Sequence, residues 1–170
     1  TQHPNFPLFP SEAGELTVFE APANHGDNFG TRIRGYVYPP LDGAYVFWIA
    51  SDDEGELWLS ADDARKDFRK IADVKGWTGA REWEKDGSQK SGAIPLKAGQ
   101  RYYIEALSKD GIGGDLLAVG WQLPNGTQER PIPGNRLSPC APAKWVTLDI
   151  ATTSAGIETR FIKQKDGSML

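Results

Sequence analysis

The sequence has few of the residues on which disulfides, zinc sites and histidine-based catalysis depend. It contains one cysteine, Cys140, and two histidines, His3 and His25, among 170 residues. A single cysteine forms no disulfide within the chain, and a zinc site or a Ser-His-Asp triad needs several suitably placed partners. We therefore expect that the chain is not an enzyme, and the cysteine count leaves its redox compartment open.

The sequence also lacks blocks of basic residues and long apolar runs. The net charge is −4, and the 19 Lys and Arg residues are scattered. Nucleic acid binding needs clustered basic side chains, and a membrane-spanning helix needs roughly 18 or more apolar residues in succession. We expect neither a nucleic acid partner nor membrane insertion.

Turn-forming residues are abundant. The chain has 19 Gly and 12 Pro, and the turn dipeptides Asp42-Gly43, Asp86-Gly87, Asp110-Gly111 and Asn125-Gly126 separate short apolar runs. Frequent turns between short runs rich in β-branched and aromatic residues are typical of strands. The sequence therefore predicts an all-β fold.

Eight segments have the length and alternation of strands. They are residues 15–19, 31–38, 44–50, 57–59, 68–74, 94–96, 101–106 and 116–123. Residues 44–50 are apolar on both alternating faces, which predicts a central strand. The short connections predict one antiparallel hairpin between 31–38 and 44–50 and a second between 94–96 and 101–106.

Proline-rich stretches suggest the domain boundaries. We expect an N-terminal extension over 1–14, a β-domain over 15–138 and a linker over 139–144. Residues 145–170 either close the sheet structure or begin a further module.

An acidic link between two predicted strands is the main candidate site. Asp52 and Asp53 follow the central strand directly. Two carboxylates 4 Å apart repel by about 4 kcal/mol at an effective dielectric constant near 20, which a cation would offset. Calcium accepts six to eight oxygen ligands in flexible geometry, and the glycine-rich loop around Asp110 and Asp115 can add oxygens. The alternative is that the pair caps a turn and stays solvated.

Three tryptophans lie in polar surroundings where they can contact a ligand. Trp58, Trp77 and Trp83 either stack on sugar rings or pack into the protein. Glycoside hydrolysis needs two carboxyl groups roughly 5 to 10 Å apart on opposite sides of the bond. Adjacent aspartates do not provide that arrangement. The residues therefore favour sugar binding over sugar hydrolysis.

The order and spacing of several motifs between residues 16 and 137 resemble the PA14 domain. These motifs are Tyr36-Val37-Tyr38, Gly43-Ala44-Tyr45-Val46-Phe47, Ser51-Asp52-Asp53, Leu57-Trp58-Leu59, Leu96-Lys97-Ala98-Gly99-Gln100-Arg101-Tyr102-Tyr103-Ile104-Glu105, Gly113-Gly114-Asp115 and Val119-Gly120-Trp121. Arg81-Glu82-Trp83 and Gln89-Lys90-Ser91 are similar to PA14 modules of large secreted bacterial proteins and some animal surface proteins.

The resemblance implies a two-sheet antiparallel β-sandwich with long loops at one end. In sugar-binding members of the family, an Asp-Asp pair joined by a cis peptide holds calcium, and the calcium binds neighbouring sugar hydroxyls. Asp52 and Asp53 match that pair. The loop 109–115 corresponds to the one that completes the calcium shell, but it lacks the asparagine-rich character of the fungal members.

The function that the resemblance implies is a calcium-dependent carbohydrate-binding module, monomeric within a larger extracellular or cell-surface protein. Asp52, Asp53, Asp110 and Asp115 are the expected calcium ligands, and Trp58, Trp77 and Trp83 are the expected sugar contacts. Other PA14 domains bind no sugar. The alternative is therefore a non-catalytic structural or protein-interaction spacer with a stabilising metal site.

Overall fold

The structure is a computed structural model that describes residues 10–64, 67–140, 146–147 and 162–163. The chain divides into two units, Thr1–Pro139 and Cys140–Leu170. In the second unit the described strands β10 (Val146–Thr147) and β11 (Ile162–Lys163) pair antiparallel. Most of the predicted linker and of the segment 145–170 lies outside the described residues, as do residues 1–9 of the predicted extension.

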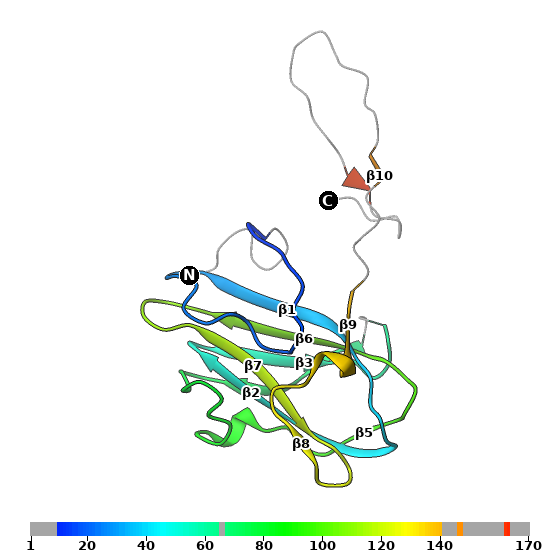
Figure 1. Cartoon of the computed structure of the whole chain (residues 1–170). Helices are drawn as coiled ribbons and strands as arrows, with labels where there is room; N and C mark the ends of the chain where they lie inside the picture. The colour runs from blue at the N-terminus through cyan, green and yellow to red at the C-terminus, as the bar shows by residue number, and fades with distance from the viewer. Residues whose placement is uncertain (1–9, 65–66, 141–145, 148–161, 164–170) are drawn as a thin grey trace. The chain divides into compact units, whose positions relative to one another are not determined.

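Two antiparallel sheets build the first unit (Figure 1). One sheet has the order β4-β3-β6-β1-β9, with bounds Arg69–Val74, Gly55–Leu59, Tyr102–Lys109, Gly30–Val37 and Leu137–Pro139. The other has the order β5-β2-β7-β8, with bounds Ile94–Leu96, Gly43–Asp52, Leu116–Gln122 and Gln128–Glu129. The 3-10 turns η2 (Gly87–Gln89) and η3 (Gly134–Arg136) lie in the loops. Within the described ranges, the chain has no helix that is long and apolar enough to span a bilayer.

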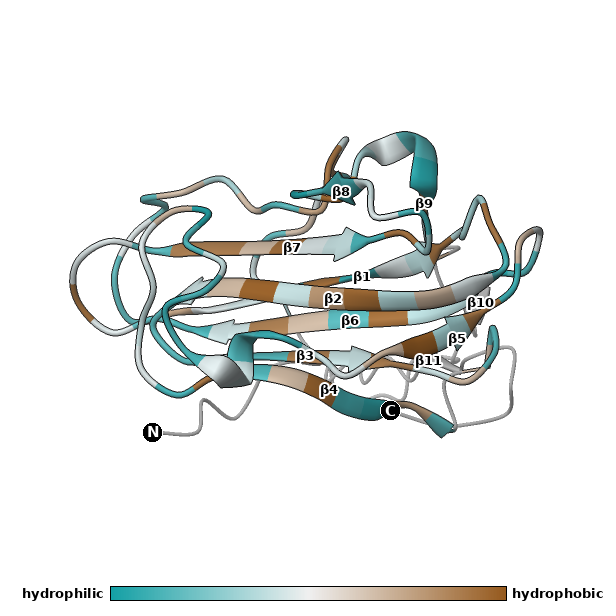
Figure 2. Ribbon diagram, turned by 90° about the horizontal axis from the view of Figure 1, so that it is seen from below, coloured by the Kyte–Doolittle hydropathy of each residue, from teal (hydrophilic) through white to brown (hydrophobic). Residues whose placement is uncertain are grey.

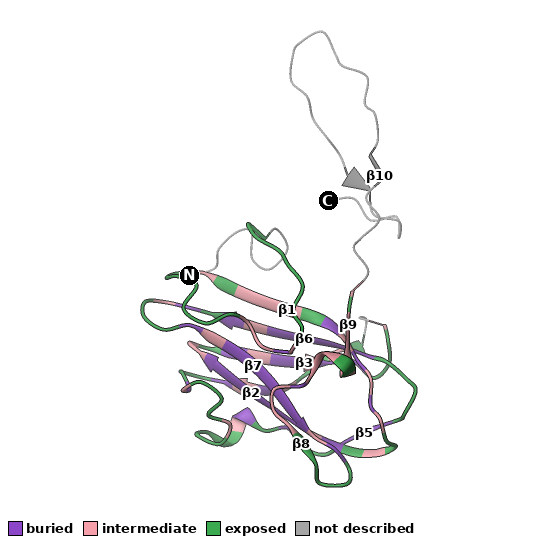
Figure 3. Ribbon diagram, viewed as in Figure 1, coloured by how far each residue is buried: buried purple, intermediate pink, exposed green. Residues whose placement is uncertain are grey.

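The core lies between the two sheets. Strand β2 packs against β3, β4 and β6, and β6 also packs against β7. Phe47, Ile49, Ile104, Val119 and Trp121 are completely buried there. Figure 3 shows the resulting run of buried residues along β2, β6 and β7, and Figure 2 shows hydrophobic residues recurring along the same strands. Burial of this apolar surface is the main force that holds the sheets together.

The predicted all-β class and the two-sheet antiparallel sandwich are confirmed. The segment 44–50 is a central strand, as predicted, because β2 lies between β5 and β7 and Trp48 is buried on the face opposite Phe47. The predicted inward face of 116–123 is also confirmed, since Leu117, Val119, Trp121 and Leu123 are all buried.

Both predicted hairpins are wrong. Strand β1 pairs with β6 and β9, whereas β2 pairs with β5 and β7 in the other sheet. Strands β5 and β6 likewise belong to different sheets. The physical reason is that each sheet must bury one apolar face against the other. A short connection can therefore join strands of the two facing sheets as well as neighbouring strands of one sheet. The predicted strand 15–19 is reduced to isolated bridges at Val18 and Glu20.

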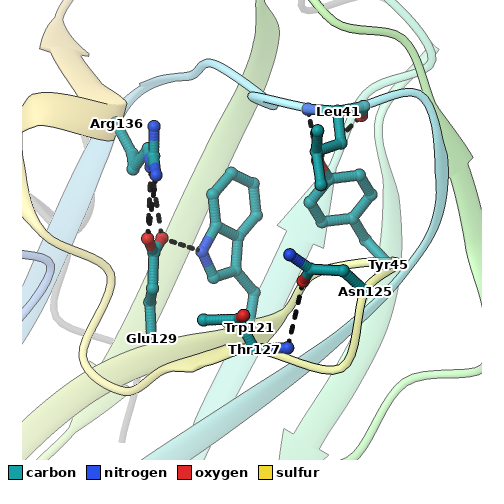
Figure 4. A network of polar contacts seen from close by, with 7 residues as sticks. All are labelled: Leu41, Tyr45, Trp121, Asn125, Thr127, Glu129 and Arg136. Carbon is teal, nitrogen blue, oxygen red and sulfur yellow. Dashed lines mark hydrogen bonds and ion pairs between the residues drawn. The ribbon is translucent and has the colours of Figure 1, made fainter.

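A partly buried set of polar contacts lies at the edge of the four-stranded sheet that carries β8 (Figure 4). The Trp121 indole N–H donates to Glu129 Oε2 at 2.6 Å, and Arg136 Nη2 donates to Glu129 Oε1 at 3.0 Å. The Tyr45 hydroxyl donates to the Leu41 carbonyl at 2.8 Å. These contacts satisfy polar atoms of two aromatic side chains that are otherwise surrounded by the core.

Glu129→Gln is expected to lower the free energy of unfolding by about 1 kcal/mol. The amide can still accept from Trp121, but it turns its N–H groups toward Arg136 and loses the ion pair. Urea unfolding followed by circular dichroism measures the change. Asp63→Asn is the matched control, because Asp63 pairs with Arg101 where both side chains are about half exposed; it should change stability by less than about 0.5 kcal/mol. A loss at Asp63 equal to that at Glu129 would contradict this prediction.

Candidate functional site

Two crossovers between the sheets meet at one end of the sandwich. The chain leaves the four-stranded sheet at Asp52 and enters the five-stranded sheet at Gly55. It returns between the end of β6 and Leu116, which lies directly opposite Asp52 in the ladder of β2 and β7. Hence the acidic link and the glycine-rich loop 110–115 lie side by side, although about 60 residues separate them in the sequence.

Hydrogen bonds tie the two crossovers together. The Gly111 N–H donates to Asp53 Oδ2 at 2.9 Å, and the Lys109 N–H donates to the Glu54 carbonyl at 2.9 Å. A Cβ at Gly111 would lie 2.9 Å from Asp53 Oδ2, so a side chain there would displace the Asp53 carboxylate. The peptide between Asp52 and Asp53 is cis, which confirms what the family resemblance implies.

A third segment, 21–28, lies against the glycine-rich loop. The Asn28 N–H donates to the Gly111 carbonyl at 2.6 Å, and the Gly113 N–H donates to Asp27 Oδ1 at 3.1 Å. A Cβ built at Gly114 would lie 3.7 Å from both Asn24 Oδ1 and Asp52 Oδ2. Asn24 Oδ1 and Asp52 Oδ2 therefore both lie close to Gly114, although they come from two different segments.

Asp115 holds the segment 24–26 against this loop through hydrogen bonds. Its Oδ2 accepts hydrogen bonds from the backbone N–H groups of His25 and Gly26, and its carbonyl accepts from the Asn24 N–H. The Asp115 side chain is buried. Its position therefore gives it a structural role, beside any role as a metal ligand.

Asp110 has the most unusual environment of the four predicted ligands. Its residue is only 6% exposed, and its Oδ2 is buried without a hydrogen-bond partner among the described residues. Burying a carboxylate oxygen without a partner costs free energy. A buried carboxylate oxygen without a hydrogen-bond partner is expected at a site where a cation binds to it.

The electrostatics of the site fit the same interpretation. Burial raises the pKa of the Asp110 carboxyl above its ordinary value, and the neighbouring charges of Asp115, Asp53 and Asp27 raise it further, while the backbone N–H of Asn28 opposes the shift. Burial also raises the pKa of Asp52, to which Asp53 and Asp110 add, while Lys85 opposes the shift. The carboxylates therefore repel one another, and a bound cation would relieve that repulsion.

The pKa shifts predict a pH dependence that can be tested in chelator. A raised pKa means that the folded chain binds more protons than the unfolded chain, so these groups contribute less stability as pH rises from about 4 toward 7. Asp110→Asn removes one such charge. The variant should therefore be more stable than the wild type at pH 7, and the difference should shrink toward pH 4. Urea unfolding at several pH values checks this. A variant less stable than the wild type at pH 7 would contradict it.

The acidic residues do not form a complete metal centre by themselves. In the described part of the chain, no group of three or more His, Cys, Asp or Glu side chains is arranged to hold an ion. The carboxylates of Asp52, Asp53 and Asp110 are close enough to affect one another's charge, and the Asn24 amide oxygen lies near Gly114, as does Asp52 Oδ2. A shell of mixed carboxylate, amide, carbonyl and water oxygens suits calcium, whose coordination is flexible.

One predicted tryptophan lies beside the acidic link. The loop that follows β4 runs along the edge of β2, where the Thr78 N–H donates to the Ser51 carbonyl at 2.8 Å. The preceding residue, Trp77, is 57% exposed, and Lys85 Nζ lies 3.1 Å from the centre of its ring. Since Thr78 is bonded to Ser51, its neighbour Trp77 lies near the end of β2 that leads into the acidic link.

The other two tryptophans lie elsewhere. Trp83 is half-buried and borders a cavity of about 380 Å³ together with Lys85 and Arg130. Trp58 is half-buried on β3, with its ring 5.2 Å from that of Phe68 and its indole N–H donating to Glu56. The structure thus brings Trp77 to the acidic site, places Trp83 beyond Lys85, and leaves Trp58 packed on the five-stranded sheet.

Sequence reasoning missed Asn24 and Asp27 as site residues, because the segment 21–27 carries only the Pro, Asn and Gly signature of a loop. The one available signal was its content of oxygen-bearing side chains between turn residues. Its position next to the glycine-rich loop depends on long-range pairing, which the sequence pattern does not contain.

Comparison with known proteins identifies the family. A PA14 domain model matches residues 16–135. The mouse N-acetyl-beta-glucosaminyl-glycoprotein 4-beta-N-acetylgalactosaminyltransferase 1 is 39% identical over 123 residues, which cover 69% of this chain and 12% of that protein. Mouse fibrocystin-L is 33% identical over 84 residues, covering 49% of this chain and 2% of that protein. The chain thus spans only a small part of these relatives.

Two solved structures share the fold. The A domain of epithelial adhesin 6 from Candida glabrata, in complex with Galβ1-3GlcNAc, has a TM-score of 0.52 and 17% identity and covers 69% of this chain and 54% of its own. An anti-sigma factor domain-containing protein has a TM-score of 0.51 and 22% identity and covers 72% of this chain and 38% of its own. Since the PA14 model covers more than half of the sequence, this chain belongs to the PA14 domain family.

Proposed function

We propose that the chain is a calcium-dependent carbohydrate-binding module of a larger extracellular or cell-surface protein. The observation that carries the proposal is the buried, unpartnered Oδ2 of Asp110 beside the carboxylates of Asp52 and Asp53. A spacer domain without a ligand gains nothing from this arrangement, because the uncompensated charges lower its stability.

The donor set fits calcium. Asp52, Asp53 and Asp110 would supply carboxylate oxygens, and the Asn24 amide and the carbonyls of residues 111–114 would complete the shell with water. When bound, calcium would take up neighbouring hydroxyls of a sugar as further oxygen ligands. The chain's own residues orient the site: the Gly111 N–H positions Asp53, and Asp115 fixes the segment 24–26 through two backbone N–H groups.

The surface around the acidic link supports a sugar as the ligand. Trp77 presents more than half of its surface to solvent beside Asp52, and aromatic rings pack against the apolar faces of sugars. Trp83 would contact a longer glycan that extends past Lys85. We propose a binding role without catalysis.

The comparisons give independent support. The adhesin domain that shares the fold was solved with a bound disaccharide, and the most similar relative given above is named as an enzyme that acts on glycoproteins. The chain corresponds to a small part of that enzyme. This fits a module that holds glycan for a larger protein.

A glycan array probed in calcium and again in chelator tests the proposal. We expect bound glycans in calcium and loss of the signal in chelator. Binding that persists in chelator would refute the calcium-dependent mechanism and move the site onto the tryptophans. A blank array would refute sugar binding and favour the spacer with a stabilising metal site.

A further inference from the structure

A second hollow adjoins the acidic site. It has a volume of about 530 Å³ and is lined by the segment 20–23, by Ala80 and Arg81, and by Leu116. Leu116 is the direct cross-strand partner of Asp52. Ala23 lines the hollow and precedes Asn24, whose Oδ1 lies near Gly114, as does Asp52 Oδ2. A ligand held at the acidic link therefore has this hollow beside it.

The hollow has an aliphatic lining and one charged pair. Ala21, Pro22, Ala80 and Leu116 supply small apolar surfaces. Arg81 and Glu20 stand at its edge and are joined by two hydrogen bonds, from Nε to Oε1 at 2.9 Å and from Nη2 to Oε2 at 2.7 Å. Its volume lies within the roughly 300 to 1,000 Å³ range of small-molecule sites, so it has room for a sugar substituent.

The pair at the edge keeps unused hydrogen-bonding capacity. A guanidinium has five N–H groups, and in the described part of the chain Arg81 uses two of them on Glu20. Each Glu20 oxygen likewise has a second lone pair. The hollow therefore offers, close together, a donor, an acceptor and a small apolar surface.

We propose that this hollow is a subsite for the acetamido group of an N-acetylated hexosamine, a proposal that rests on the proposed function. An acetamido group carries one carbonyl, one N–H and one methyl group. The carbonyl accepts from Arg81, the N–H donates to Glu20, and the methyl group packs among Ala80, Pro22 and Leu116. A sugar with a plain hydroxyl group at that carbon leaves the apolar surface uncovered. The hydroxyl is also too small to reach both Arg81 and Glu20.

Matched sugar pairs test this subsite directly. N-acetylglucosamine against glucose, and N-acetylgalactosamine against galactose, are titrated into the chain in calcium and followed by calorimetry. We expect the N-acetylated member of at least one pair to bind about tenfold more tightly, from one buried methyl group and the added hydrogen bonds. Equal affinities within both pairs would overturn the subsite and leave the proposed function standing. No binding of any of the four would also overturn it, and the glycan array then decides the proposed function separately.

Two variants locate the preference in the hollow. Ala80 is exposed, and Ala80→Leu fills the hollow with a larger side chain. The N-acetylated sugar and its plain counterpart should then bind with nearly equal affinity (an affinity ratio close to one), while the affinity for calcium is unchanged. Ala93→Leu is the control, because Ala93 is exposed and precedes β5, which pairs with the opposite end of β2. Arg81→Gln keeps a straight side chain at the same positive φ of 54° and should also reduce the ratio. An unchanged ratio in both Ala80→Leu and Arg81→Gln would overturn the assignment.

Discussion

Asp53→Asn is expected to weaken calcium binding by about 100-fold or more while the fold is retained. The substitution removes one negative charge from the acidic link but changes neither the size nor the shape of the side chain. The amide oxygen can still accept the hydrogen bond from the Gly111 N–H, so the two crossovers stay together. Titration calorimetry with calcium measures the loss, and circular dichroism checks the fold.

Asp63→Asn is the matched control for this experiment. It makes the same chemical change in the second aspartate pair of the chain, Asp62-Asp63, where Asp63 is about half exposed and pairs with Arg101. Calcium affinity should be unchanged in that variant. Equal calcium affinity in wild type and Asp53→Asn would remove Asp53 from the site.

Trp77→Ala is expected to lower sugar affinity by roughly 30-fold, the effect of losing about 2 kcal/mol at an aromatic contact residue, and to leave calcium affinity unchanged. Trp77 is 57% exposed, and Lys85 Nζ covers one face of its ring, so the other face is the one we expect to contact a sugar held at the acidic link. Titration calorimetry with the preferred glycan in saturating calcium measures the change.

Trp58→Ala provides the comparison for Trp77. Trp58 packs on Phe68 on the five-stranded sheet, so its removal should lower stability and leave sugar affinity nearly unchanged. A larger loss of sugar affinity at Trp58 than at Trp77 would contradict the placement of the sugar beside Asp52.

The sequence predicts the strands well and their partners poorly. Alternation within 116–123 identified the inward face of β7, and the doubly apolar run 44–50 identified a central strand. These features are local, because side chains alternate with a period of two in any strand. Pairing depends on contacts between distant segments. Glycines such as Gly55, where a Cβ would lie 2.6 Å from Ser51 Cβ, permit the chain to cross between sheets instead of turning back.

For the candidate site, the predicted aspartates do come together, but their environments differ in ways that a sequence does not show. Asp110 and Asp115 lie in the same glycine-rich loop, yet Asp115 is held by backbone N–H groups while Asp110 keeps an unpartnered oxygen. That difference arises from the segment 21–28, which packs on the loop from far away in the sequence. The hollow at Arg81 and Glu20 has the same origin, since 61 residues separate the two side chains.

A calcium titration of the metal-free wild-type chain by calorimetry tests whether Asp52, Asp53 and Asp110 form a cation site. We expect saturable binding at one site per chain, with a dissociation constant on the order of 10⁻⁶ to 10⁻³ M. Absence of binding at calcium concentrations of about 10 mM would contradict it, because the carboxylates of Asp52, Asp53 and Asp110 would then lie together without a cation to offset their repulsion.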